Sequence, residues 1–371
     1  MRKIIQAYEI ISILGIVQGI FLSVLLLLKK KNKTANYFLS ALIALVAFIL
    51  LYNLLVSNGI FTEYYSLSVF VNTIVFLFPT LHWLYAVFLL GPSKKIVFKN
   101  LSYFSAFAIV NVMSIPVYLK NQSAIYIYGW IFDNNINNLI SAIYSIIVMF
   151  YVLKLLKDYS TKIKMNFSSI EKINLNWLKA ITIIIIIFDF FLILLLYLPG
   201  WLKFDSSVPN IMLIILTVSL IYITAIFGFR QPEIYQVNDL PADTVKYKTS
   251  GLSEEKAIEI EQKLNEFFKD NKPFLDDNLN INDLSDRLNI TPAYLSQVLN
   301  ERLGINFYTL INKYRIEEAK KLIIDHEYSN MKLEVIAYEV GFNSKSTFNA
   351  AFKKFTGMTP SQFRTQTKEI N

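Results

Sequence analysis

The first 229 residues contain seven apolar stretches, each long enough to cross a hydrocarbon layer of about 30 Å. They lie at 8–28, 36–56, 68–90, 98–119, 136–156, 177–198 and 208–228. Residues from about 230 onward are instead rich in Lys, Glu, Asp and Asn, as in a soluble helical protein. The sequence therefore predicts an all-α chain with a seven-helix transmembrane bundle over 1–229, a juxtamembrane linker over 230–251 and a soluble domain over 252–371.

The lysines between the apolar stretches predict the orientation of the bundle. They follow the first, third and fifth stretches, whereas the alternate connections contain only Lys120 and Lys203. Because basic loops remain on the cytoplasmic side of a membrane, we expect a multi-pass protein with its N-terminus outside and its C-terminal domain in the cytoplasm. Arg2 and Lys3, before the first stretch, reduce this asymmetry without reversing it.

Several classes of chemistry are excluded by composition. The chain contains no cysteine, which rules out disulfides, thiolate metal sites and cysteine catalysis. The two histidines, His82 and His326, are far apart in the sequence, and no pair of carboxylates lies inside the apolar stretches. We therefore expect no enzyme activity, no metal and no cofactor.

His82 and Asp189 are the ionisable side chains that lie well inside the apolar stretches, where such groups are costly. At a rise of about 1.5 Å per residue, their depths in the bundle differ by only about 6 Å. They can contact each other or share a ligand pocket, which makes them candidate sensing residues. Alternatively, each one hydrogen-bonds a neighbouring group and serves packing alone.

Residues 280–303 carry the pattern of a helix-turn-helix unit. Asn280 can cap a first short helix, and Thr291 can cap a second one. Pro292 then occupies the first helical position, where its missing N–H costs nothing. The second helix buries an apolar face and leaves small or polar side chains on the other face, namely Ala293, Ser296, Gln297 and Asn300. Two short helices joined by a tight turn are a form that proteins use to read the DNA major groove.

The same unit recurs over residues 332–356. Leu284 and Leu288 of the first copy recur as Ile336 and Val340, and Gly304 recurs as Gly357. A single connecting helix over Phe307–Asp325 is expected between the copies. The outward face of the second copy carries Lys345, Ser346, Asn349 and Lys353. No acidic residue occurs from 340 to 368, and this late basic character suits contact with phosphate.

Three runs of residues carry a family resemblance. They are Arg315–Leu322 (RIEEAKKL), Ile336–Phe342 (IAYEVGF) and Phe348–Arg364. These runs resemble the AraC/XylS family of bacterial regulators, and the chain as a whole is similar to a membrane-bound subgroup with a multi-span N-terminal half. The resemblance covers about residues 252–366. It implies two recognition helices that enter successive major-groove segments on one face of the DNA, in a protein of the bacterial cytoplasmic membrane.

The resemblance also implies which residues contact DNA. Base readout falls on Ala293, Ser296, Gln297, Lys345, Ser346 and Asn349, and phosphate contacts fall on Asn300, Arg302 and Lys353. Ala293 departs from the larger residues often found at its position, so weaker sequence discrimination is expected from the first copy.

The leading functional hypothesis is a one-component transcription regulator, in which a small-molecule or lipid-like signal at the membrane half controls binding to double-stranded DNA. Two alternatives remain open. The spans can serve only as an anchor in the lipid bilayer while a partner protein supplies the signal, or a transporter-like domain can be fused to a regulator. The helix expected after Ser253 is either the first helix of the DNA-binding domain or part of a homodimer contact, and its apolar stripe consists of Ala257, Ile260, Leu264 and Phe267.

Overall fold

The computed structural model describes residues 2–60, 65–91, 104–118, 134–197, 207–231, 252–325, 328 and 331–370. The described part of the chain is helical apart from turns, loops and one isolated bridge between Phe167 and Asn280. It divides into two compact units, Met1–Lys157 with Leu175–Gln236, and Asp158–Asn174 with Val237–Asn371. The second unit therefore includes the connection between two helices of the apolar half.

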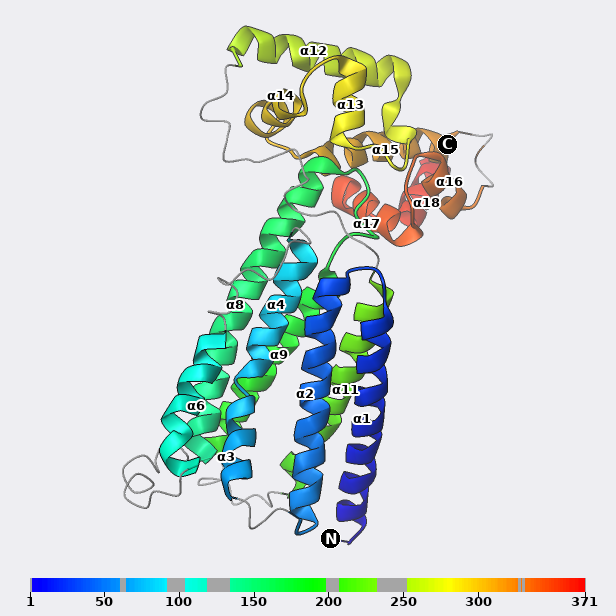
Figure 1. Cartoon of the computed structure of the whole chain (residues 1–371). Coiled ribbons are helices and arrows are strands. Elements are labelled where there is room, and N and C mark those ends of the chain that lie inside the picture. The colour runs from blue at the N-terminus through cyan, green and yellow to red at the C-terminus, as the bar shows by residue number, and fades with distance from the viewer. Residues whose placement is uncertain are drawn as a thin grey trace. The chain divides into compact units, whose positions relative to one another are not determined.

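The first unit is a bundle of long apolar helices (Figure 1). Its elements are α1 (Arg2–Leu28), α2 (Lys33–Ser57), α3 (Tyr65–Ile74), α4 (Leu77–Leu90), α6 (Ser105–Tyr118), α8 (Asn134–Asn166, of which the last turns count with the second unit), α9 (Asn176–Tyr197) and α11 (Ser207–Arg230). Large apolar side chains face outward, with Leu28 72%, Val112 64% and Phe190 66% exposed. A soluble protein rarely exposes so much apolar surface, which is compatible with a lipid environment.

Five described helical segments are long and apolar enough to cross a membrane. They are Gln6–Leu28, Lys33–Ser57, Leu67–Leu90, Ile136–Asn166 and Asn176–Leu194. Two shorter apolar helices, Ser105–Ile115 and Ile214–Arg230, coincide with the fourth and seventh expected spans. The expected all-α architecture, an apolar helical half followed by a helix-turn-helix domain, is confirmed, while the count of seven spans stays a prediction.

The third apolar segment is broken between α3 and α4. Pro79 has no N–H, so the carbonyl of Val75 accepts a hydrogen bond from the Phe78 amide instead (3.1 Å). The Phe76 amide likewise bonds back to Thr73, and the carbonyl of Asn72 accepts a bond from Asn137 Nδ2 of α8 (3.0 Å). A broken helix inside a membrane persists where neighbouring groups satisfy the freed carbonyls in this way.

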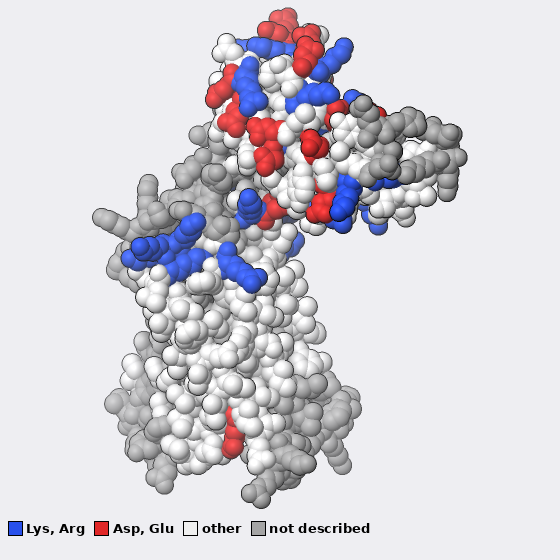
Figure 2. All heavy atoms as spheres, turned by 90° about the vertical axis from the view of Figure 1, so that its right-hand side faces the viewer, with Lys and Arg blue, Asp and Glu red and all other residues white. Residues whose placement is uncertain are grey.

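Basic residues gather at one end of the bundle. Lys29, at the end of α1, donates to the carbonyls of Gly228 (2.9 Å) and Gln231 (2.7 Å). Trp177, at the start of α9, donates to Gln231 Oε1 (2.6 Å), so three helix ends meet there. On the face shown in Figure 2, the described surface of the bundle is uncharged over most of its length, with Lys and Arg at one end. The lysines at 94, 95, 99, 120 and 203 lie outside the described residues.

The second unit is a domain of short helices. Its elements are α12 (Glu254–Asn271), η5 (Pro273–Leu275), α13 (Ile281–Leu288), α14 (Pro292–Gln297), the π-helical turn η6 (Val298–Arg302), α15 (Phe307–Ile324), α16 (Leu333–Glu339), α17 (Lys345–Thr356) and α18 (Pro360–Ile370). Ser253, Asn280 and Thr291 accept hydrogen bonds from backbone amides in the first turns of α12, α13 and α14, as the sequence predicts. Residues 232–251, which hold most of the expected linker, lie outside the described residues.

The long helix α15 joins two hydrophobic cores. Its first half, including Leu310 and Ile311, packs with α12, α13 and α14, and its second half, including Ile316 and Ala319, packs with α16 and α17. The expected connecting helix is thus confirmed within one residue of its C-terminal end. Each helix-turn-helix unit has its own core, and α15 fixes one core relative to the other.

The stripe on α12 is not a free surface. Ala257 and Ile260 pack against Val298, and Leu264 and Phe268 lie in the core of the first helix-turn-helix unit. Phe267 is partly buried against the same core. Of the two expected alternatives, the structure therefore favours α12 as the first helix of the domain, because its apolar residues complete the domain and are not available as a homodimer face.

Candidate nucleic-acid interface

In the second helix-turn-helix unit, α17 presents a polar face to solvent. Lys345, Ser346 and Lys353 are exposed and Asn349 is half-buried. Phe348 and Phe352, on the opposite side of α17, are fully buried. Ser344 caps the helix by accepting a hydrogen bond from the Thr347 amide (3.2 Å). The positions expected to face DNA therefore share one accessible face, which begins at the helix N-terminus.

The turn before α17 requires glycine. Gly341 has a φ of 90°, in the left-handed region that disfavours other residues. A Cβ at this position would lie 2.8 Å from the carbonyl oxygens of Phe274 and Leu275. Any larger residue would push this turn away from η5, which belongs to the first half of the domain.

The first helix-turn-helix unit differs from the expectation. Ala293 is exposed, but Ser296 is only 1% and Gln297 9% exposed. Asn300 Nδ2 donates to the carbonyl of Ser296 (2.8 Å), and Gln297 Nε2 donates to Glu301 Oε2 (2.8 Å). The expected outward placement of Ser296 and Gln297 is wrong for this structure, because side chains one turn later along the chain engage them.

Arg302 is held by the acidic face of α12. It forms ion pairs with Glu254 and Glu261, and the distance from Arg302 Nε to Glu261 Oε2 is 2.9 Å. The hydrogen bond that Arg302 donates to Glu261 raises the pKa of Arg302, and the charges of both glutamates act in the same direction. Arg364, on α18, is also engaged within the domain, where it donates to the carbonyl of Met331 (2.8 Å). The accessible lysines of α17 are therefore better placed for phosphate than either arginine.

Comparison with known proteins identifies the domain. A family model described as a helix-turn-helix domain matches residues 284–366. This region is an AraC-type helix-turn-helix domain. An uncharacterized HTH-type transcriptional regulator of Staphylococcus aureus strain COL is 35% identical over 88 residues, which are 24% of this chain and 11% of the relative. The uncharacterized HTH-type transcriptional regulator YtdP of Bacillus subtilis strain 168 is 28% identical over 92 residues, 25% of this chain and 12% of the relative.

Among solved structures, the C-terminal domain of AraT, a response regulator from Geobacillus stearothermophilus, is 30% identical. The match covers 32% of this chain and 88% of that chain, with a TM-score of 0.26. The chain spans only 11 to 12% of the length of the two curated relatives named above.

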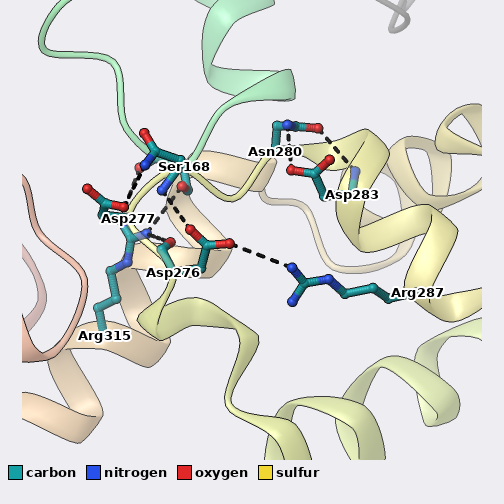
Figure 3. Close-up of polar contacts among 8 residues, drawn as sticks. Ser168, Asp276, Asp277, Asn280, Asp283, Arg287 and Arg315 are labelled. Atoms are coloured by element: carbon teal, nitrogen blue, oxygen red, sulfur yellow. Dashed lines mark hydrogen bonds and ion pairs between the residues drawn. The ribbon is translucent and has the colours of Figure 1, made fainter.

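Arg315, on α15, is the centre of a buried polar cluster in the unit that contains the AraC-type domain (Figure 3). It is 1% exposed and donates from Nε to the carbonyl of Phe274 (2.7 Å) and from Nη2 to the carbonyl of Asp276 (2.7 Å). Its guanidinium also lies over the ring of Phe342, 5.6 Å from the centroid. Burial lowers the pKa of Arg315 to about 10, and the charges of Glu171, Asp277 and Asp276 oppose this shift. The cluster joins the two halves of the domain.

The connection between α8 and α9 takes part in the same cluster. Ser168 is 1% exposed, and its hydroxyl accepts a hydrogen bond from Arg315 Nη2 (3.2 Å). The Ser168 amide donates to the carbonyl of Leu279 (3.2 Å). Asn343 Nδ2, in the turn before α17, donates to Ser169 Oγ (2.7 Å). Sequence reasoning missed these residues, because the connection contains no motif, and the arginine at an apolar position of α15 was the only indication.

His82 and Asp189, in the apolar helical bundle, line one cavity of about 290 Å³. His82 Nε2 is hydrogen-bonded to Thr182 Oγ1 of α9 (3.1 Å). The geometry thus combines two of the expected alternatives, since His82 bonds a neighbouring hydroxyl and also shares a pocket with Asp189.

Proposed function

We propose that this protein is a membrane-embedded transcription regulator that binds specific sites in double-stranded DNA through α14 and α17. The observation that carries this proposal is the accessible polar face of α17 in an AraC-type domain. Lys345, Ser346 and Asn349 would read base edges in the major groove, and Lys353 would contact phosphate. The protein acts by binding and carries out no catalysis in this account.

The first helix-turn-helix unit would contribute to DNA binding after a local rearrangement. Ala293, Ser296 and Gln297 are the proposed base-reading residues, and Asn300 and Arg302 are the proposed phosphate contacts. Four of these five side chains are buried or engaged within the domain. DNA would have to replace the glutamate partners of Gln297 and Arg302. We therefore expect the second helix-turn-helix unit to supply most of the initial affinity for DNA.

We further propose that the membrane half controls the DNA-binding half, with His82 and Asp189 at the site of sensing. The supporting observation is that the connection between α8 and α9 is seated in the same compact unit as the AraC-type domain. A simple anchor requires no such contact, because the linker after α11 suffices to tether the domain. A change that moves the ends of α8 or α9 would act on Arg315 and on the turn before α17.

For the topology, we propose that the basic end of the bundle lies in the cytoplasm of a bacterium and that the N-terminus lies outside. The lysines at the ends of α1 and α8 and the position of Arg230 at the end of α11 support this orientation. The AraC-type domain would then lie on the side of the membrane where DNA is present.

A direct test is the recovery of crosslinked DNA from cells that express the full chain, followed by sequencing. The proposal expects enrichment of a few sites that share one sequence pattern, and loss of that enrichment in Asn349→Ala at equal protein abundance. Recovery of DNA without a shared pattern, or equal enrichment by Asn349→Ala, would contradict sequence-specific binding by α17.

A further inference from the structure

The cavity in the apolar helical bundle is lined by residues of several of its helices. Its wall takes residues from α2, α4, α8, α9 and α11, and Val75 from the break between α3 and α4. Its volume of about 290 Å³ is near the lower end of the range for small-molecule sites, roughly 300–1,000 Å³. Ile43, Val46, Phe78 and Ile185 are among the apolar residues that line it. The space therefore suits a compact, mainly apolar molecule.

Two polar side chains in this cavity, Asp189 and Ser145, are incompletely hydrogen-bonded among the described residues. Asp189 is 7% and Ser145 5% exposed, and both line the cavity. Within the described part of the chain, Asp189 Oδ2 and Ser145 Oγ are buried and neither atom makes a hydrogen bond of full geometry, although the two side chains lie close to each other. An incompletely hydrogen-bonded carboxyl oxygen in an apolar interior is costly, and more so within a membrane. A bound group that donates hydrogen bonds to both atoms would remove this cost.

We propose that this cavity binds a small lipophilic amine, with its ammonium group on Asp189 and Ser145 and its apolar body against the aliphatic and aromatic wall. This inference rests on the proposed function, in which such a molecule is the signal that the membrane half senses. Among the residues that line the cavity, Asp189 has the one carboxyl group that an ammonium group can pair with. His82 is already hydrogen-bonded to Thr182.

The lining residues favour an amine over other ligands. They include no lysine or arginine, and an anionic head group would face the carboxyl of Asp189 without a compensating cation. A bare metal cation would require several oxygen ligands, whereas the wall of the cavity is mainly aliphatic. An organic ammonium needs only a few acceptors, and its hydrocarbon part gains from burial against the wall.

The test measures binding to the full-length protein in nanodiscs with matched probes. The probes are 1-adamantanamine and octylamine, with 1-adamantanol and adamantane-1-carboxylate as controls that keep the adamantane body and change the head group. We expect both amines to raise the unfolding temperature and to bind at least about tenfold more tightly than the alcohol. The carboxylate should not bind.

Two variants assign the binding to the cavity. Asp189→Asn should weaken amine binding by at least about tenfold, because the amide cannot pair with an ammonium group. Ser145→Ala should weaken it by a smaller factor and keeps the test available if Asp189→Asn does not fold. Glu9→Gln is the matched control, since it removes a carboxyl group of α1 that is not part of the cavity wall, and it should leave binding unchanged.

Absence of binding by both amines would overturn the proposal, as would equal affinity for the alcohol or full amine binding in Asp189→Asn. A separate reporter of transcription distinguishes this inference from the proposed function. Amine binding that depends on Asp189 but leaves the reporter unchanged would support the site and contradict the sensing role. A reporter that responds to other compounds while the cavity binds no amine would contradict the site alone.

Discussion

The guanidinium of Arg315 donates hydrogen bonds to the hydroxyl and the backbone carbonyl of Ser168, a residue 147 positions earlier in the chain. Ser168 belongs to the connection between two apolar helices, and Arg315 belongs to the helix that joins the two helix-turn-helix cores. The same guanidinium donates to the carbonyl of Asp276 (Figure 3) and to the carbonyl of Phe274. One buried side chain thus holds the α8–α9 connection and both halves of the AraC-type domain.

The Arg315–Ser168 contact predicts the effect of Ser168→Ala. Loss of the hydroxyl leaves one N–H of a buried arginine without its acceptor, at a cost of about 1–3 kcal/mol. Hydrogen exchange of the backbone amides over residues 166–174 should therefore become at least about fivefold faster in the full-length protein. Ser160→Ala removes a hydroxyl on α8 that is not part of this cluster, and it should have no effect. Unchanged exchange in Ser168→Ala would show that the contact does not hold the segment in place.

Much of the AraC-type domain could be predicted from the sequence, because its information is local. The caps Asn280 and Thr291 and the apolar periodicity around α15 depend on residues a few positions apart. The same periodicity in α12 leaves open whether the helix packs within the domain or against a second copy, and the structure shows that it completes the core. An amphipathic stripe shows that a helix is packed on one side, but it does not show against which element.

Asn300 and Glu301, one turn later, engage Ser296 and Gln297, whereas the ion pairs of Arg302 join residues that are distant in the sequence. Arg302 pairs with Glu254 and Glu261, which lie on another helix of the domain. No pattern in α14 or η6 indicates these partners, so the sequence alone suggests that Arg302 of η6 is available for phosphate. The connection at 167–169 was missed for the same reason, because its contacts to Leu279, Arg315 and Asn343 exist only in the folded unit.

The ion pairs of Arg302 predict that α12 restrains DNA binding by the first helix-turn-helix unit. The double variant Glu254→Gln, Glu261→Gln frees Arg302 for phosphate, and DNA affinity should rise. The slope of log affinity against log salt should also become steeper by about one unit. The matched control is Glu255→Gln with Glu259→Gln, which removes the same charge from α12 without touching the ion pairs. If both double variants behave alike, net charge and not the release of Arg302 explains the change.

The position of the lysines predicts the result of fusion experiments. A reporter enzyme that is active only outside the cytoplasm should be silent when fused after Asn371 and active when inserted within 121–135, most of which lies outside the described residues. The physical reason is the retention of basic connections on the cytoplasmic side. The opposite pattern would contradict both the orientation and access of the domain to DNA.

The most direct test of the central claim is the binding of a recovered DNA site by the full-length protein in nanodiscs, measured against altered sites and over a range of salt concentrations. The account predicts that Lys345→Ala and Asn349→Ala lose about 1–3 kcal/mol of discrimination between sites. It predicts that Lys353→Ala weakens binding to all sites alike and reduces the salt slope by about one. Identical behaviour of Lys345→Ala and Lys353→Ala, or discrimination that survives in Asn349→Ala, would contradict readout of DNA by α17.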